Sequence, residues 1–335
     1  MGRRWRLSTI RLSIICLTII FLSTLYLSFS SLPEPCNCPS TSSTHLEDDN
    51  APKQRTITET AQNKSIVVDE TEHWGPHKLG IIVPFRDRFE ELTEFVPYMH
   101  QYLNRQKIRH KIYVMNQADH FRFNRASLIN SGFLISQKES VDYIAMHDVD
   151  LLPINQELRY EYPEKGPYHI ASPKLHPKYH YDKFVGGILL LNKFDFIKIN
   201  GLSNRYWGWG MEDDEFYVRM MEAGLQISRP ENITTGTENT FKHIHDKRKR
   251  QRDYNRYYNQ KQEMKRRDRL TGVDTVQYTI DNQHDITISG APVTVYNILL
   301  ECDLLATPWC IHPDVLAASK RKERIVEKYD RPIKH

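Results

Sequence analysis

The 335-residue sequence has little excess charge of either sign. It contains 46 Lys and Arg against 42 Asp and Glu, a formal net charge of +4. So small an excess does not argue for a nucleic-acid-binding protein, because those proteins usually carry a strongly basic face. There is also no internal repeat, and Arg6 stands where a myristoylation signal requires Ser or Thr. With 39% hydrophobic and 26% charged residues, the composition is that of an ordinary globular protein.

Charge is absent from one long stretch near the N-terminus. Residues 12–32 contain no charged side chain, and at about 1.5 Å per residue they cover a hydrocarbon core of roughly 30 Å. Three of the first six residues are Arg, which favours a cytosolic N-terminus. We therefore predict a cytoplasmic tail at 1–11, a transmembrane signal-anchor at 12–32 and a lumenal remainder. A cleaved signal peptide is the alternative, with Ser28 and Ser30 before the cut.

The next segment, residues 33–73, is rich in Pro, Ser, Thr and acidic residues and shows little periodicity. Such a composition cannot bury enough apolar surface to fold, so we predict a flexible stem. The lumenal catalytic domain is then expected at 74–335. Asn63 and Asn232 each begin an N-glycosylation sequon that this compartment would allow to be used.

Cysteine is scarce, with five residues in the whole chain. Only Cys302 and Cys310 fall in the expected catalytic domain. In an oxidising lumen, two cysteines eight residues apart between strand-like and loop-like sequence predict a disulfide.

Short apolar runs alternate with helical patterns in the first half of the domain. We predict strands at 79–84, 111–116 and 143–147 and helices at 89–105 and 125–139. This alternation is typical of an α/β protein with a Rossmann-like, mostly parallel sheet and flanking helices. Ligands of such sheets bind beyond the carboxyl ends of the strands. Further on, we expect a helix at 212–223, strands at 276–280, 286–289 and 293–300, and a closing helix at 313–328.

Two carboxylates, Asp148 and Asp150, directly follow the expected strand 143–147. At this position they can hold a hard divalent cation or a sugar hydroxyl, although a single D-x-D is also common in turns and caps. In an extended segment, His243 and His245 point to the same side and can meet one metal, or they can form an exposed polar strand edge. Imidazole with carboxylate suits Mn²⁺ and leaves positions open for a diphosphate.

The run from 206 to 215 reads YWGWGMEDDE. Its glycines let the backbone turn sharply, and its indole rings can pack on the C–H faces of a sugar. The four acids that follow can simply favour a helix N-terminus, but one of them can also accept a proton from an attacking hydroxyl. Another charged run, residues 247–252 (KRKRQR), is interpreted as a solvated segment, with a site for an acidic partner as the alternative.

Taken together and in this order, several segments resemble the β-1,4-galactosyltransferase family. The resemblance covers residues 79–310 and is carried by residues 84–88 (PFRDR), 123–126 (FNRA), 148–150 (DVD), 184–187 (FVGG) and 207–214 (WGWGMEDD). It implies a GT-A fold, Mn²⁺ as cofactor and a UDP-sugar as donor.

The resemblance also implies roles for individual residues. Asp150, His243 and His245 would bind Mn²⁺, and Asp213 would be the general base. The donor would contact Pro84, Phe85, Arg86, Arg88, Phe123, Arg125, Asp148, Val149, Gly187 and Trp209. The acceptor would contact Tyr179, Tyr181, Phe184, Trp209, Glu212, Asp213 and Asp214.

Within the family, the His-x-His pair resembles the xylose-directed branch, since other members carry Met-x-x-His. Tyr179 and Tyr181 match aromatic positions of the same branch. We therefore expect transfer of galactose from UDP-galactose to O4 of xylose on proteoglycan core proteins, at the Golgi membrane, with no nucleic-acid partner. The alternative is a β-1,4-galactosyl- or N-acetylgalactosaminyltransferase that acts on N-acetylglucosamine. Phe184, where the family usually has Tyr, leaves the choice of donor open.

Overall fold

The computed structural model describes residues 74–318. The predicted tail, signal-anchor and stem, with the sequon at Asn63, lie outside the described residues. No helix between residues 74 and 318 has the length and apolar character that a bilayer crossing requires.

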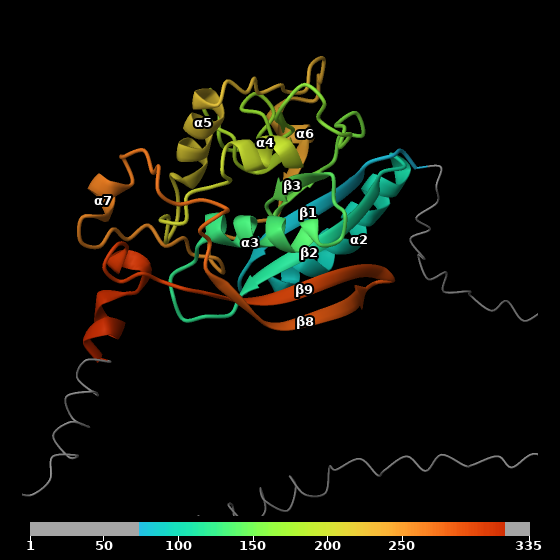
Figure 1. Ribbon diagram of the computed structural model, residues 1–335. Coiled ribbons are helices and arrows are strands. Elements are labelled where there is room, and N and C mark those ends of the chain that lie inside the picture. Colours follow the sequence, from blue (N-terminus) through green and yellow to red (C-terminus); the bar gives the residue numbers. More distant parts are fainter. Residues whose placement is uncertain (1–73, 319–335) are drawn as a thin grey trace, which may run out of the picture. The chain divides into compact units, whose positions relative to one another are not determined.

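A seven-stranded mixed sheet forms the centre of the domain, in the order β5-β6-β3-β1-β2-β9-β8 (Figure 1). Its strands are β1 (Lys78–Phe85), β2 (Arg109–Gln117), β3 (Tyr143–His147), β5 (Tyr168–His169), β6 (Ile188–Asn192), β8 (Tyr278–Ile288) and β9 (Ala291–Leu300). The four central strands pair in parallel, whereas β5–β6, β6–β3 and β9–β8 pair antiparallel. The prediction of a mostly parallel sheet is thus right at the centre and wrong at the edges. Only two residues, Ser289 and Gly290, join β8 to β9, and so short a connection permits only an antiparallel hairpin.

The central strands are buried on both faces. On β1, Leu79 and Ile81 belong to the core on the side of α2 (Phe89–Arg105), whereas Ile82 belongs to the core on the side of α3 (Arg125–Gln137). Alternate residues of a strand point to opposite faces, so the continuous apolar run fills two cores at once. The result is a three-layer arrangement, with α2 and α3 on either side of the sheet (Figure 1).

The remaining elements are short. They are β4 (Leu151–Pro153), α4 (Lys193–Lys198), α5 (Glu212–Glu222), α6 (Gly236–Asn239), β7 (Phe241–His243), α7 (Gln260–Glu263) and the 3₁₀ turn η1 (Pro308–Cys310). The two strands predicted at 276–280 and 286–289 are one strand, β8, whose pairing is irregular between Ile280 and Asn282. Of the predicted closing helix, residues 313–318 are described, and they are helical.

Cys302 and Cys310 form a disulfide, with their Cα atoms 6.3 Å apart. The carbonyl of Cys310 accepts a hydrogen bond of 2.7 Å from the amide of Arg122, which joins this C-terminal loop to the segment between β2 and α3. Asn232 is exposed, with a φ of 60°.

Candidate active site

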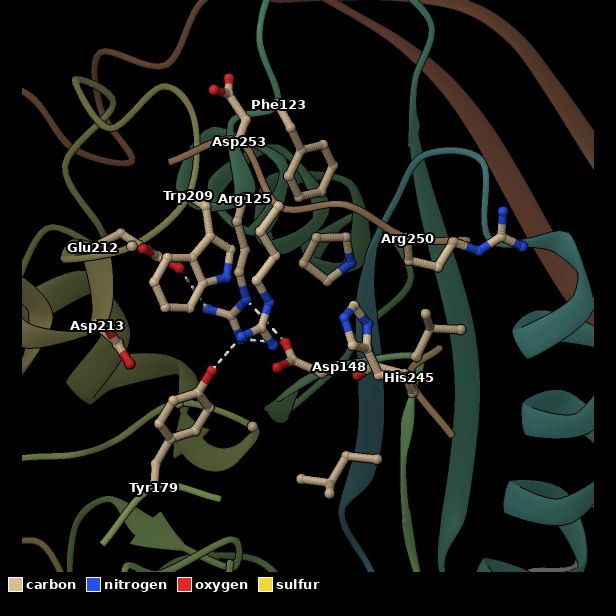
Figure 2. Close-up of a pocket in the computed structure, with 18 of the residues that line it drawn as sticks. Phe123, Arg125, Asp148, Tyr179, Trp209, Glu212, Asp213, His245, Arg250 and Asp253 are labelled. Carbon is tan, nitrogen blue, oxygen red and sulfur yellow. Dashed lines mark hydrogen bonds and ion pairs between the residues drawn. The ribbon is translucent and has the colours of Figure 1, made fainter. Parts of the chain in front are cut away.

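One cavity of about 580 Å³ opens where β1 and β3 end (Figure 2). Its position agrees with the rule that ligands bind at the carboxyl ends of parallel strands. All but one of the residues predicted to bind donor, acceptor or metal, or to act as the base, line it. They are Pro84, Arg86, Arg88, Phe123, Arg125, Asp148, Val149, Asp150, Tyr179, Tyr181, Phe184, Gly187, Trp209, Glu212, Asp213, Asp214, His243 and His245. The exception is Phe85, which is 8% exposed and belongs to the core on the α2 side. Its side chain is therefore not placed to contact a donor in this cavity.

The pairing of two short strands brings the predicted metal ligands together. β4 directly follows Asp150, and it pairs antiparallel with β7, so that Leu151 lies opposite His243. The amide of Ile244 then donates to the carbonyl of Asp150 at 2.9 Å. This register places both imidazoles beside one carboxylate.

The three side chains form an oxygen–nitrogen donor set. His245 Nδ1 lies 3.2 Å from Asp150 Oδ2, and His243 Nε2 lies 3.9 Å from Oδ1. His245 Nδ1 is buried without a well-directed hydrogen bond, as expected of a nitrogen whose natural partner is a cation. Among the described residues, no group of three such side chains is already at coordinating positions, so the three would have to adjust to share one ion. The chemistry of this set fits Mn²⁺.

Electrostatics keep Asp150 ionised. Burial raises the pKa of Asp150, but the close contact with His245 and the electrostatic effects of His243 and Arg88 outweigh burial. The net pKa therefore lies below the usual value, and Asp150 remains a carboxylate at neutral pH.

Asp148 forms an ion pair on the other side of the cavity. The Asn124 side chain caps α3 by accepting the Ser127 amide at 2.9 Å, which places Arg125 at the first helical position. From there, Arg125 Nε and Nη2 lie 2.9 and 2.8 Å from Asp148 Oδ1, and Nη1 lies 4.0 Å from Glu212 Oε1. Burial lowers the pKa of Arg125, but these carboxylates more than compensate and the net pKa is raised. Arg125 thus links Asp148, which follows β3, to Glu212 at the start of α5.

The two arginines after β1 differ in how many of their donors are already used. Arg86 donates to the carbonyls of Gln117, Phe121 and Asp119 at 3.1, 2.7 and 3.1 Å, so most of its N–H groups hold the loop after β2. Arg88 Nη1, in contrast, is buried without a hydrogen-bond partner. It lies 3.7 Å from Glu91 Oε1, an ion pair that leaves its N–H groups available to a phosphate oxygen.

Three acids face the cavity from the first turn of α5. Burial, together with the charges of Glu212 and Asp214, raises the pKa of Asp213 to about 8, although the charge of Arg125 opposes the shift. The pKa of Glu212 is raised as well, mainly by burial. A carboxylate whose pKa lies near the working pH is suited to proton transfer, which fits the predicted role of Asp213 as a base.

Aromatic side chains line the cavity beside the acids of α5. Trp209 is 37% exposed, and Tyr179 and Tyr181 lie near Phe184, with ring centroids 5.0 and 5.6 Å from that ring. In Figure 2, the Tyr179 hydroxyl points toward Asp148 and Arg125, beneath Trp209. Flat rings around a small polar centre can hold a sugar by stacking and hydrogen bonds.

The basic run 247–252 also contributes to the cavity, which the sequence alone did not indicate. Arg250 binds Glu91 on α2 through Nε at 2.7 Å, and its side chain points away from the other labelled residues in Figure 2. Arg252 instead lies 4.7 Å from the Trp209 ring and donates to the Tyr179 hydroxyl at 2.6 Å. The segment is therefore largely anchored to the protein. Because the run is almost uniformly basic and has no apolar pattern, neither partner could be predicted from the sequence.

Two family descriptions match the chain. Residues 38–163 match the N-terminal region of glycosyl transferase group 7, and residues 166–244 match the N-terminal domain of galactosyltransferase. A solved structure of a mutant Drosophila β-1,4-galactosyltransferase 7, in complex with manganese, UDP-Gal and xylobiose, is 58% identical with a TM-score of 0.69. The similarity covers 70% of this chain and 99% of that one. Fold and site together define a glycosyltransferase of the GT-A fold.

Comparison with curated relatives shows to which family the chain belongs. Beta-1,4-galactosyltransferase 7 of Mus musculus is 60% identical over 243 residues, which cover 72% of this chain and 74% of the relative. Xylosylprotein 4-beta-galactosyltransferase of Caenorhabditis elegans is 50% identical over 238 residues, or 70% and 82% of the two chains. The chain belongs to the β-1,4-galactosyltransferase family.

Proposed function

We propose that this protein is an inverting galactosyltransferase that moves galactose from UDP-galactose to O4 of xylose, in the linkage region of glycosaminoglycans on proteoglycan core proteins. The observation that carries the proposal is that the Asp150–His243–His245 set and Asp213 face the same cavity. The mouse and worm relatives and the Drosophila complex with UDP-Gal and xylobiose support the same donor and acceptor.

The reaction follows from the placement of Asp213. The xylose O4 attacks the anomeric carbon of galactose while Asp213 takes the O4 proton, a new C–O bond forms, and the bond to the diphosphate breaks. Attack opposite the leaving group converts the α-linked donor into a β-linked product. A second carboxylic acid, of the kind a glycosidase needs, is not required because UDP leaves without protonation.

Asp150, His243 and His245 would hold Mn²⁺, which neutralises charge on the departing diphosphate when it is bound. Arg88, whose Nη1 is buried without a hydrogen bond, would donate one to a phosphate oxygen. Asp148, oriented by Arg125, would contact the donor sugar.

The aromatic wall accounts for the choice of acceptor. Xylose lacks the hydroxymethyl group of glucose and N-acetylglucosamine, so a pocket bounded by Tyr179, Tyr181 and Trp209 can exclude the larger sugars. At the donor, Phe184 is buried and bulky but has no hydroxyl. We therefore infer a preference for galactose with some transfer of N-acetylgalactosamine.

We also propose that the protein is a single-pass Golgi membrane protein with a lumenal catalytic domain. The uncharged stretch 12–32 after an arginine-rich start supports an anchor. The Cys302–Cys310 disulfide suits an oxidising compartment, and the exposed Asn232 could be glycosylated there.

An acceptor panel tests the proposed activity. Purified protein is given UDP-galactose or UDP-N-acetylgalactosamine with a β-xyloside, an N-acetylglucosaminide or glucose, each with and without Mn²⁺. We expect fastest transfer from UDP-galactose to the β-xyloside, and only with Mn²⁺. Faster transfer to the N-acetylglucosaminide would favour the alternative acceptor, and fast hydrolysis of UDP-galactose without acceptor would indicate a hydrolase.

A further inference from the structure

His176 is a buried residue in the cavity wall that has no part in the reaction described above. It is 3% exposed and lies in the loop between β5 and β6. Its backbone amide donates to the carbonyl of Ser172 at 2.8 Å, and Ser172 is itself buried. The position of the imidazole is therefore fixed by the backbone that precedes it.

One nitrogen of this ring organises the residues that follow. Nδ1 of His176 accepts hydrogen bonds from the amides of Lys178 and Tyr179, at 2.9 and 3.0 Å. Because a ring nitrogen that accepts must carry a lone pair, the Nδ1 side is fully used by the backbone. Two amides held by one acceptor fold residues 176–179 into a tight turn. Tyr179 leaves that turn with its hydroxyl directed into the cavity (Figure 2).

The faces and edges of the ring are occupied as well. The imidazole centroid lies 5.0 Å from the ring of Tyr179, 5.0 Å from that of Phe184 and 6.4 Å from that of His243. His176 thus stands between the aromatic wall and a predicted metal ligand. Removing its acceptor atom would leave two partly buried amides without this partner, and the backbone would rearrange to satisfy them.

We propose that His176 is a positioning residue for the acceptor site, which sets the orientation of Tyr179 through the two backbone hydrogen bonds at Nδ1. The inference rests on the proposed function, since it assigns to Tyr179 a contact with the xylose acceptor. His176 acts on the acceptor only through Tyr179.

A matched pair of substitutions tests this assignment. His176→Asn places its amide oxygen close to the position of Nδ1, whereas His176→Gln places it one bond further out, near Nε2. Both are neutral and polar, and His176→Ala removes the acceptor altogether. KM and kcat are measured for a β-xyloside, with KM for UDP-galactose, the Mn²⁺ activation curve and Tm of each variant. The Gln and Ala substitutions are also made in a Tyr179→Ala background.

We expect His176→Asn to keep the acceptor KM within about threefold of wild type, and His176→Gln and His176→Ala to raise it about 10- to 30-fold. The donor KM and the Mn²⁺ curve should change little. In the Tyr179→Ala background, the same substitutions should raise the acceptor KM less than twofold, because residues that act as a unit are not additive.

Three results would overturn the assignment: equal acceptor KM values for the Asn and Gln variants, an undiminished effect of His176→Gln when Tyr179 is Ala, or a displaced Mn²⁺ curve with an unchanged acceptor KM. If His176→Gln does not fold, the comparison of the Asn and Ala variants decides in the same way. A wild-type protein that does not transfer to β-xylosides would instead overturn the proposed function.

Discussion

Replacing Glu212 with Gln should shift the pH dependence of transfer to lower pH. Burial and the charges of Glu212 and Asp214 raise the pKa of Asp213 to about 8. A general base works only when ionised, so the rate should rise with pH until Asp213 has lost its proton. Glu212→Gln keeps the size of the side chain and removes the neighbouring negative charge that acts most strongly on Asp213.

The size of the shift follows from Coulomb's law. As an order-of-magnitude scale, two unit charges roughly 8 Å apart at an effective dielectric constant of about 20 repel by about 2 kcal/mol, or about 1.5 pH units. The pKa of Glu212 is itself raised, so this group carries only part of its charge near neutrality. We therefore expect the acid limb of the profile to move down by about one pH unit. A bound cation lowers the apparent pKa of Asp213 in both wild type and Glu212→Gln, so the difference between their pH profiles is preserved.

The assay is kcat/KM for a β-xyloside between about pH 5.5 and 9, with saturating UDP-galactose and Mn²⁺. Glu222→Gln is the matched control, because Glu222 ends the same helix, outside the cavity, and binds Arg267 and Arg269. The control should reproduce the wild-type limb. An acid limb that stays in place in Glu212→Gln, or moves to higher pH, would refute the reasoning that this charge controls Asp213.

Three further predictions concern the same cavity. Asp213→Asn should lower kcat on the order of 10²–10⁴-fold. Near wild-type turnover would exclude Asp213 as the base. Without metal and donor, Asp213→Asn should also raise Tm more at pH 8 than at pH 5. The reason is that the folded-state pKa of Asp213 is raised to about 8, so its carboxylate destabilises the fold as the pH rises above the pKa of an unfolded Asp. His245→Ala should move the Mn²⁺ titration to at least about tenfold higher concentration, and an unchanged curve would show that His245 is not a ligand. Gly186→Ala would put a Cβ atom 2.8 Å from Asp213 Oδ2 and 2.7 Å from Phe184 Cε2. The displaced carboxylate should lower kcat about 10- to 100-fold, with Tm within a few degrees of wild type. Full activity would show that the carboxylate can move without loss of catalysis.

The sequence by itself determined the elements whose signals are local. The helix predicted at 89–105 is α2 with the same bounds, and the strand predicted at 143–147 is β3. Helical periodicity reflects burial of one face of a helix, and a continuous apolar run reflects burial of both faces of a strand. Each pattern can be read within a single segment of the sequence. Asp148 and Asp150 follow a buried strand, and the sequence therefore pointed to the end of the sheet at which the cavity lies.

Other features were decided only by the tertiary structure. The pairing of β7 with β4 sets His243 and His245 beside Asp150, although a long stretch of chain separates them. The side chains of the basic run take their positions from distant partners. Arg250 binds Glu91, and Arg252 binds the Tyr179 hydroxyl. The sequence did not indicate the raised pKa of Asp213 or the role of His176 either. Each of these properties arises from burial and from neighbours that are distant in the chain, and only the folded chain supplies both.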